Sequence, residues 1–293
     1  MANLHLLIID PQNDFCDLPD EYRVSAPGGG RLEPALPVAG AHADMQRLSA
    51  LIDAGRPGLA AITVTLDSHQ RFDIAHPTFW RDANGEALAP LTPISAADLR
   101  AGRVVPRDAA LHERVQAYLD ALEHAGRYTH MVWPVHCELG SWGHNIHFDL
   151  HAALNRWEDA HATYFAKVTK GENPLTEHYS AVQAEVPDAG DPATQLNQTL
   201  LARLRSADRV YIAGEAGSHC VKATVEHIVA NWPSDELGKL TLIEDCISAV
   251  AGFEAAYAGF LADMKARGVR VTTSSAVHAD WVGNTDHAEA KLI

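Results

Sequence analysis

Cys220 is the side chain in this sequence best placed for covalent chemistry. A strand-like run, RVYIAG at 209–214, leads into it, and an apolar helical pattern from Val221 to Val229 follows. A thiol at a helix N-terminus feels the positive end of the helix, which favours the thiolate, and the free N–H groups there can hold an oxyanion. Free cysteines are also among the residues most often buried. This stretch alone therefore leaves both a nucleophile and a core thiol open.

Two polar residues at other strand ends could activate such a thiol. Asp10 follows the apolar run at 4–9, and Lys170 follows the run at 162–168. A carboxylate can take the proton of a thiol, and an ammonium group can hold the pair in register and favour its charged form. Asp10, Lys170 and Cys220 then form a catalytic triad by role.

A third set of residues has the composition of a metal site. Asp67 and His69 lie two residues apart after the run at 59–65, on the same side of an extended chain. His76 and His136 could complete the shell. A carboxylate with imidazoles suits one divalent ion, Zn²⁺, Fe²⁺ or Mn²⁺. The chain has 17 histidines, so chance pairings are expected as well.

The pair His147 and His151 shows how easily such a pattern arises. Its i, i+4 spacing could hold zinc, but the run HNIHFDLH lacks the glutamate of a zinc-protease motif. We therefore interpret this pair as part of a solvated helix face.

Alternating strand-like and helical patterns predict the frame that brings the candidate residues together. The strand-like runs lie at 4–9, 59–65, 130–133, 162–168, 209–214 and 239–244, with a weaker one at 269–274. Apolar helical repeats lie at 38–52, 111–125, 195–206 and 253–264. This alternation indicates an α/β protein, a three-layer α/β/α sandwich with a central, mostly parallel, Rossmann-like sheet. The carboxyl ends of parallel strands share one edge, where we expect the candidate residues to meet.

The pattern predicts a single domain over 1–293 with two departures. Residues 81–128 are predicted to be an insertion, rich in Pro, Gly and Ala up to about residue 110, with a short helix near Ser95. A lid, an oligomer contact and an inert loop remain open for it. The tail at 278–293 is polar and predicted to be loosely held.

Composition favours a small molecule as the partner. The formal net charge of −15 would repel nucleic acid and anionic membranes. No apolar run approaches the roughly 20 residues of a membrane-spanning helix, and the N-terminus lacks the features of a signal peptide, which predicts the cytoplasm. The four cysteines form no CxxC pair and are predicted to be free thiols. Whether the chain forms a homo-oligomer stays open.

Five blocks, in order, resemble the nicotinamidases of the isochorismatase-like cysteine hydrolase superfamily. The blocks are LLIIDPQNDF, LDSHQ…H, WPVHC…SWG, KGENPLTEHYSA and AGEAGSHCVKAT, and they span residues 6 to 224. The resemblance implies the isochorismatase-like fold and metal-assisted hydrolysis of nicotinamide to nicotinate and ammonia, through a thioester on Cys220. The ring nitrogen would be held at the metal. The alternative is the same chemistry on another small amide or carbamoyl compound.

The resemblance also implies a role for each matching residue. Cys220 matches the nucleophile, Asp10 the general base and Lys170 the third member of the triad. The matches to metal ligands are Asp67, His69, His136 and, as a fourth ligand present in some members, His76.

The remaining matches concern the substrate. Phe15 and Trp133 match aromatic residues that sandwich the pyridine ring, and Tyr179 matches a pocket-lining tyrosine. The Glu215–Ala216 peptide matches a cis bond, with the N–H groups of Ala216 and Cys220 as the oxyanion hole.

Departures from the family pattern bear on the substrate more than on the chemistry. The residues from Glu215 to Ser218 differ from the family's usual ones, and the long 81–128 segment could reshape the mouth of the pocket. Other hypotheses are a metal-free isochorismatase-type reaction, a catalytically silent binding domain, and a metal catalyst with a structural Cys220. The complete triad and ligand set favour the amidase.

Overall fold

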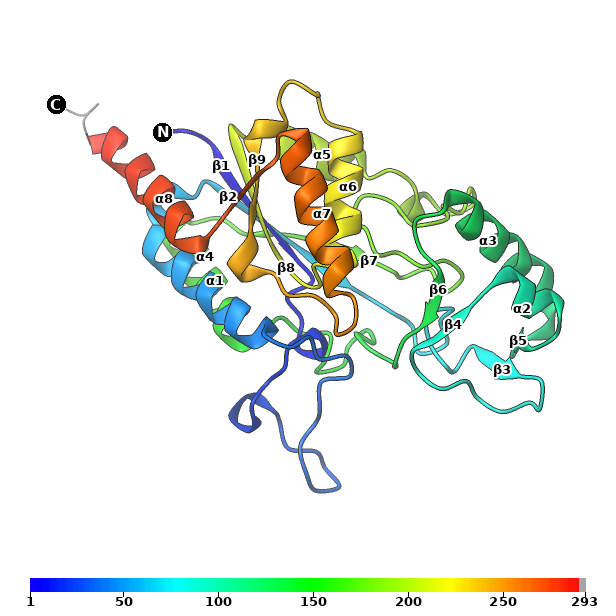
Figure 1. Ribbon diagram of the computed structural model, residues 1–293. Helices are drawn as coiled ribbons and strands as arrows, with labels where there is room; N and C mark the ends of the chain where they lie inside the picture. Colours follow the sequence, from blue (N-terminus) through cyan, green and yellow to red (C-terminus); the bar gives the residue numbers. More distant parts are fainter. Residues whose placement is uncertain (290–293) are drawn as a thin grey trace.

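The structure is a computed structural model that describes residues 1–289, with side chains to residue 284. Its centre is a six-stranded parallel sheet with the strand order β10-β9-β8-β1-β2-β7 (Figure 1). The strands are β1 (Leu4–Ile9), β2 (Ala61–Asp67), β7 (Ala166–Lys170), β8 (Arg209–Gly214), β9 (Leu240–Ile243) and β10 (Arg270–Thr272).

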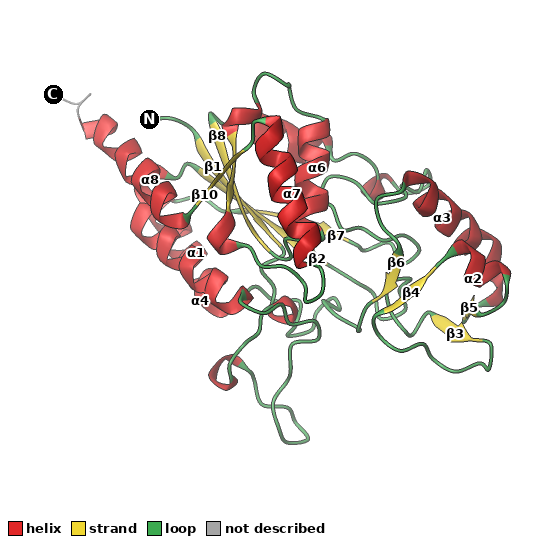
Figure 2. Cartoon of the chain, in the orientation of Figure 1, coloured by secondary structure: helices red, strands yellow, loops and turns green. Residues whose placement is uncertain are grey.

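Helices cover both faces of this sheet (Figure 2). One layer holds α1 (Ala41–Gly55), α4 (Phe148–His161) and α8 (Ser274–Glu289), and the other holds α5 (Gln198–Arg205), α6 (Cys220–Ala230) and α7 (Glu254–Arg267). Successive side chains of β1 point to opposite faces: Leu6 and Ile8 pack in the core under the first layer, and Leu7 and Ile9 in the core under the second. Burial on both faces explains the continuous apolar runs. The predicted three-layer α/β/α sandwich is confirmed.

The run at 130–133 corrects one prediction. It forms a strand, β6 (His130–Val132), but this strand pairs antiparallel with β4 (Thr92–Ile94), outside the central sheet. A second antiparallel pair joins β3 (Trp80–Asp82) to β5 (Val104–Pro106). An apolar run predicts a strand but does not predict which strand it pairs with, because pairing depends on residues far away in the sequence.

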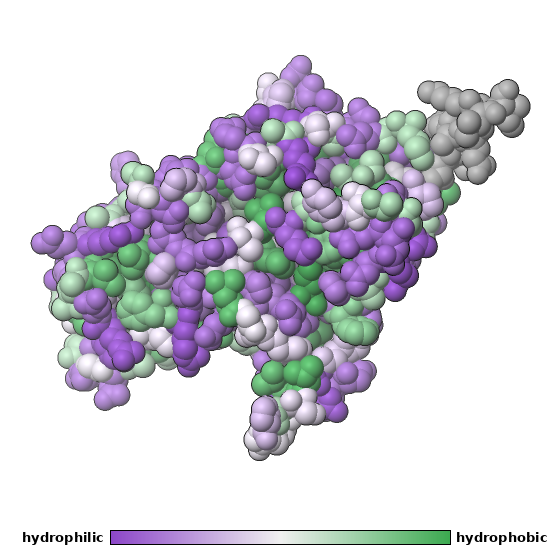
Figure 3. Space-filling model, turned by 180° about the vertical axis from the view of Figure 1, so that it is seen from behind, coloured by the Kyte–Doolittle hydropathy of each residue, from purple (hydrophilic) through white to green (hydrophobic). Residues whose placement is uncertain are grey.

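These two strand pairs, with α2 (Ala96–Arg100) and α3 (His112–Ala125), form a lobe at the right of Figure 1. This lobe contains the predicted insertion at 81–128. It has a hydrophobic core of its own, which includes Phe79, Trp80 and Leu119. The predicted short helix near Ser95 is confirmed as α2, which Ser95 caps by accepting from the Asp98 N–H. The segment is therefore folded rather than an inert loop. Seen from behind, hydrophilic residues dominate the visible surface of the molecule (Figure 3).

The C-terminal helix α8 corrects the prediction of a loosely held tail. Trp281 is fully buried, and a Cβ at Gly55 or Gly58 would lie 2.7 or 2.0 Å from its atoms. Asn284 donates to the carbonyl of Gly58 at 2.8 Å. One aromatic side chain thus anchors this helix against α1 and η3 (Arg56–Gly58). Residues 290–293 of the predicted tail lie outside the described residues.

Short 3₁₀ helices complete the fold. They are η1 (Asn13–Phe15), η2 (Asp20–Tyr22), η3 (Arg56–Gly58), η4 (Ala109–Leu111), η5 (Pro192–Thr194), η6 (Leu237–Lys239) and η7 (Glu244–Cys246). Within residues 1–289, no helix has the length and apolar character needed to cross a bilayer. The four cysteines are free and buried, as free thiols were predicted.

Candidate active site

The carboxyl edge of the central sheet brings the three predicted triad residues together. Asp10 directly follows β1, Lys170 ends β7, and Cys220 begins α6 after β8. Lys170 Nζ lies 2.9 Å from Asp10 Oδ2 and 3.6 Å from Cys220 Sγ. All three side chains are buried. The acid, the ammonium group and the thiol are therefore in direct contact.

Burial sets the resting protonation of this cluster. It raises the pKa of the Cys220 thiol well above the ordinary value, and the Asp10 carboxyl raises it further against the effect of Lys170. Burial alone would lower the pKa of Lys170, but Asp10 and Asp67 hold it well above the usual range. The raised pKa of Cys220 favours a neutral thiol, and the raised pKa of Lys170 favours an ammonium group beside it. The position at the helix N-terminus therefore does not by itself yield a thiolate.

Lys170 also joins the triad to the candidate metal site. Its Nζ lies 2.8 Å from Asp67 Oδ1. The next residue, Gly171, has a φ of +85°, and a Cβ there would lie 3.1 Å from Asp67 Oδ1. Glycine is therefore required beside the lysine, both for its backbone conformation and for space.

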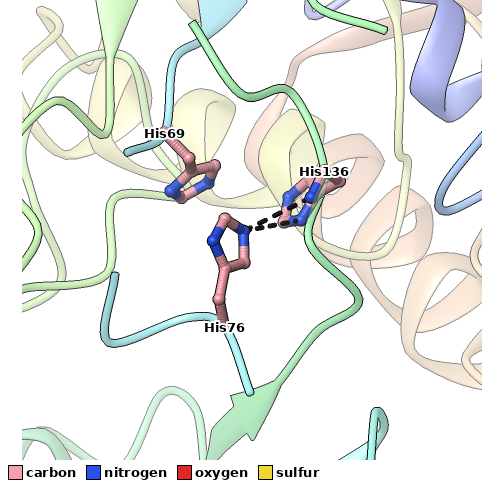
Figure 4. A group of neighbouring side chains, drawn as sticks. All are labelled: His69, His76 and His136. Carbon is pink, nitrogen blue, oxygen red and sulfur yellow. Dashed lines mark hydrogen bonds between the residues drawn. The ribbon is translucent and has the colours of Figure 1, made fainter. Parts of the chain in front are cut away.

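Three predicted histidine ligands converge in Figure 4: His69, His76 and His136. One ring nitrogen from each lies within 4.8 Å of the others, and all three residues are buried. Asp67 Oδ2 lies 3.1 Å from His69 Nε2 and 3.3 Å from His136 Nε2. The structure therefore brings together all four residues that the sequence predicted as ligands.

The outer hydrogen bonds of these histidines fit a metal ion. His69 Nδ1 lies 3.1 Å from Asp73 Oδ2, His76 Nδ1 lies 3.1 Å from the Gln70 carbonyl, and His136 Nδ1 lies 2.8 Å from the Pro134 carbonyl. Ligating histidines usually donate their second N–H to a carboxylate or carbonyl in this way, which leaves Nε2 of His69 and His136 for the ion. His76 Nε2 instead lies 3.3 Å from His136 Nδ1 and accepts from the His136 backbone N–H at 3.4 Å (Figure 4).

The donor set and its spacing agree with that interpretation. One carboxylate with imidazoles suits Zn²⁺, Fe²⁺ or Mn²⁺. Metal–ligand bonds of about 2.0–2.2 Å place neighbouring ligand atoms about 3 Å apart, the separation between Asp67 and its two histidines. The residues therefore fit one divalent ion, whose identity they do not select.

A narrow pocket with a cavity volume of about 20 Å³ is lined by Cys220 of the triad, by Asp67 and His136 of the ligand cluster, and by the predicted substrate residues. Phe15, Trp133 and Tyr179 line it together with Cys220 and His136. Trp133 Nε1 donates to the Tyr179 hydroxyl at 3.0 Å, which fixes the two rings edge to face. Its walls are aromatic and lie beside a thiol and a ligand cluster, a composition typical of sites for small, flat, polar-edged molecules.

Two further pocket residues were missed in the sequence. His219 lies between aromatic rings, with its ring centroid 5.1 Å from Trp133 and 4.7 Å from Phe253. Its Nδ1 is 2.9 Å from the Ser218 hydroxyl. Glu177 also lines the pocket, and burial raises its pKa to about 7. The position of His219 directly before Cys220 was the available signal, since neighbours of a nucleophile at a turn share its pocket.

Side chains of the DPQNDF block hold the backbone of the site residues in place. Gln12 makes two hydrogen bonds to the backbone of Asp67, accepting from its N–H at 2.7 Å and donating to its carbonyl at 2.8 Å. Asp14 accepts from the N–H of Cys137 at 2.7 Å, next to His136. These residues explain why polar side chains follow β1 in a row.

The turn before Cys220 holds two free amide donors. The Glu215–Ala216 peptide is cis. The N–H of Gly217 donates to the Ser248 carbonyl at 2.7 Å, whereas the N–H groups of Ala216 and Cys220 find no protein acceptor among the described residues. Both residues line the pocket. Two donors beside the thiol are the arrangement that an oxyanion needs.

The histidine pair at 147 and 151 departs from the prediction of a solvated helix face. His151 is exposed, but His147 is buried, with its Nε2 2.8 Å from His42 Nδ1. Burial lowers the pKa of His147 to about 4. The prediction is wrong for His147 because a helical pattern does not reveal what packs on its first turn.

Several solved structures share this architecture. The yeast nicotinamidase bound to the inhibitor nicotinaldehyde aligns with a TM-score of 0.59 at 19% identity, over 92% of this chain and 99% of that one. The pyrazinamidase of Pyrococcus horikoshii in complex with zinc aligns with a TM-score of 0.52 at 19% identity, over 92% and 99%. An isochorismatase-like hydrolase from Alkaliphilus metalliredigens aligns with a TM-score of 0.50 at 16% identity, over 96% and 100%.

The chain has the isochorismatase-like hydrolase fold. Likeness at these identities establishes the fold, so the predicted resemblance is confirmed at that level. No family model matches the chain, and no curated protein matches its sequence. Within the isochorismatase-like fold, Asp10, Lys170 and Cys220 lie at the carboxyl edge of the sheet, where α/β proteins bind their ligands.

Proposed function

We propose that this protein is a metal-assisted cysteine amidohydrolase that converts nicotinamide to nicotinate and ammonia. The observation that carries the proposal is the contact of Lys170 with Asp10, Asp67 and Cys220. It couples a nucleophile and its base to a set of metal ligands in one aromatic pocket. Two proteins of the same fold add support, a nicotinamidase with nicotinaldehyde and a pyrazinamidase with zinc.

The first half of the reaction forms the thioester. Asp10 takes the proton of Cys220, and the sulfur attacks the amide carbonyl carbon, whose π electrons move to oxygen. The N–H groups of Ala216 and Cys220 donate to that oxyanion. Lys170 keeps its charge and stabilises the anions on either side of the transfer. Asp10 then protonates the leaving nitrogen, the C–N bond breaks, and ammonia departs.

The second half regenerates the thiol. Asp10, again a carboxylate, takes a proton from water, whose oxygen attacks the thioester carbon. The same two N–H groups hold the second oxyanion. Its collapse breaks the C–S bond, Asp10 returns its proton to the Cys220 thiolate, and the nicotinic acid loses its carboxyl proton to solvent and leaves as nicotinate. One carboxylate thus serves as base and acid in both halves.

The pocket and the ligand cluster orient the substrate. Phe15, Trp133 and Tyr179 would enclose the pyridine ring. Asp67, His69, His76 and His136 would hold the divalent ion, which when bound supplies a positive charge that orients and polarises the ring nitrogen.

Ammonia release from nicotinamide tests the proposal. We expect wild type to release ammonia, Cys220→Ala to release none above background, and Asp67→Ala to lose most activity and divalent-ion binding. A Cys220→Ala protein that stays active would overturn the nucleophile assignment. If wild type binds zinc but releases nothing from nicotinamide, nicotinamide is the wrong substrate, and other small amides and carbamoyl compounds become the candidates.

A further inference from the structure

A second pair of buried acids lies beside the turn that leads to Cys220. Glu215 is fully buried, and Asp44 on α1 is 2% exposed. Ser248 bridges them: its N–H donates to Glu215 Oε2 at 3.2 Å, and its hydroxyl donates to Asp44 Oδ2 at 2.5 Å. The two carboxyl groups also lie close enough for each to shift the pKa of the other. Two carboxyl groups can bond to one another only if one of them carries a proton.

The surrounding donors place that proton on Glu215. Its Oε1 is buried and accepts no hydrogen bond from the described residues, which is costly for a charged oxygen. Asp44 instead accepts from Arg47 and Ser248, as an ionised carboxylate does. A protonated Glu215 that donates to Asp44 leaves neither acid without a partner.

This pair is tied to the backbone around the two free amide donors. The N–H of Glu215 donates to the Ile9 carbonyl at 2.7 Å, and the N–H of Gly217 donates to the Ser248 carbonyl at 2.7 Å. Ser248 therefore holds the side chain of Glu215 with its N–H and the backbone of Gly217 with its carbonyl. The residue between these anchors is Ala216.

We propose that Glu215 is a positioning residue that, as a neutral acid hydrogen-bonded to Asp44, holds the turn presenting the Ala216 and Cys220 amides. The inference rests on the proposed hydrolase function and deepens it. Glu215 acts through the turn and touches no reacting atom.

The electrostatic surroundings support a neutral Glu215. Burial, and then the charge of Asp44, raise its pKa well above the usual value. Burial also raises the pKa of Asp44, against its hydrogen bonds from Ser248 and Arg47. The titratable and charged groups that face the pair are Arg47 on α1, Cys16 and Asp17 after η1, Cys246 in η7 and Tyr257 on α7.

The sign of the pH effect follows from that raised pKa. A carboxyl whose pKa is higher in the folded than in the unfolded state stabilises the fold fully below the unfolded value, which is 4.5. This contribution is lost as the pH rises toward the folded value. Between these limits the unfolding equilibrium constant increases by up to about tenfold per pH unit.

Two substitutions at one position test the proposal. Glu215→Gln keeps a donor for Asp44 and an acceptor for the Ser248 N–H, whereas Glu215→Ala removes both. We expect Glu215→Ala to lower kcat for nicotinamide by at least about tenfold with KM within about threefold, because oxyanion donors act mainly in the transition state. Glu215→Gln should stay within about threefold of wild type. The exposed Glu113→Gln is the matched control.

Two readouts do not depend on activity. Iodoacetamide should alkylate Cys220 more than about fivefold faster in Glu215→Ala, because the loosened turn no longer shields the thiol, and at the wild-type rate in Glu215→Gln. From pH 5 to 8, the pH-dependent loss of stability should shrink in Glu215→Gln and persist in Glu113→Gln.

Three results would overturn the inference. They are a Glu215→Gln protein as impaired as Glu215→Ala, an unimpaired Glu215→Ala, and a wild-type pH slope in Glu215→Gln. A wild type without amidase activity would count against the proposed function instead, since the alkylation and stability readouts still decide the role of Glu215.

Discussion

Two buried pairs of acids lie near Cys220, and they differ in one partner. Asp10 and Asp67 contact the buried Lys170 between them. Among the side chains that the structure describes, no buried cation pairs with Glu215 or Asp44: Asp44 pairs with Arg47, whose side chain is 44% exposed. The first pair lies at the end of β1 and β2, and the second joins the turn after β8 to α1.

The difference shows how a buried carboxyl group can serve either as a proton acceptor or as a hydrogen-bond donor. Taking a carboxylate out of water is costly, and an ammonium group in contact offsets that cost. Against the effect of burial, His69 and Lys170 hold the pKa of Asp67 well below its ordinary value. Burial raises the pKa of Asp10 against Lys170, which suits a carboxylate that takes a proton from a thiol. Without such a partner, one acid of the second pair stays neutral, and it serves as a hydrogen-bond donor.

Removing the shared cation should have the largest effect. We expect Lys170→Met to lower kcat/KM by at least about 10³-fold, because the nucleophile loses its charge partner and its register with the base. The same change should cost about 3–5 kcal/mol of unfolding free energy, since it leaves two buried acids unpaired. Steady-state assays and urea unfolding measure both effects.

The exposed Lys167→Met is the matched control. Its amine lies over the Phe165 ring, so we expect a loss below about 1 kcal/mol and unchanged activity. If Lys170→Met keeps activity within tenfold of wild type, the buried cation is not what gives the Asp10–Asp67 pair its role in the reaction.

Stabilisation by zinc should be an effect of intermediate size, and it should depend on the metal ligands around Asp67 but not on the Glu215–Asp44 pair. At a free zinc concentration 100 times Kd, wild type should gain about 2.7 kcal/mol of unfolding free energy, because only the folded state assembles the ligands. His69→Gln should lose most of this gain, and Glu215→Gln should keep it. Chemical unfolding with and without zinc measures the change. An equal gain in His69→Gln would place the ion elsewhere.

The smallest effects should come from two hydroxyl donors, one on each pair. Thr65 donates to Asp10 Oδ1 at 2.5 Å, and Ser248 donates to Asp44 Oδ2 at 2.5 Å. Thr65→Val and Ser248→Ala should each cost about 1.5–3 kcal/mol of unfolding free energy. Thr65→Val should also lower kcat about tenfold, and Ser248→Ala about threefold or less, because only Asp10 moves protons in the reaction. The opposite order in kcat would contradict the assignment of Asp10 as the base.

Much of the site could be predicted because its residues follow strands. Asp10, Asp67, Lys170 and Cys220 each lie at or after the carboxyl end of a strand of the central sheet. Parallel strands align these ends along one edge, so a local pattern was enough to group the four residues. His136 was grouped with them although it follows β6, outside that sheet, and the loop after β6 delivers it to the same place.

The sequence by itself determined the alternation of strands and helices, the three layers and the residues at the sheet edge, because periodicity and strand direction are local properties. Only the tertiary structure decided the pairing of β6 with β4, the burial of His147 and Trp281, and the placing of Glu215 and Asp44 on the same serine, Ser248. Each of these depends on a partner far away in the chain. A buried acid is a base or a donor according to the charge beside it, and the sequence around Glu215 does not contain Asp44.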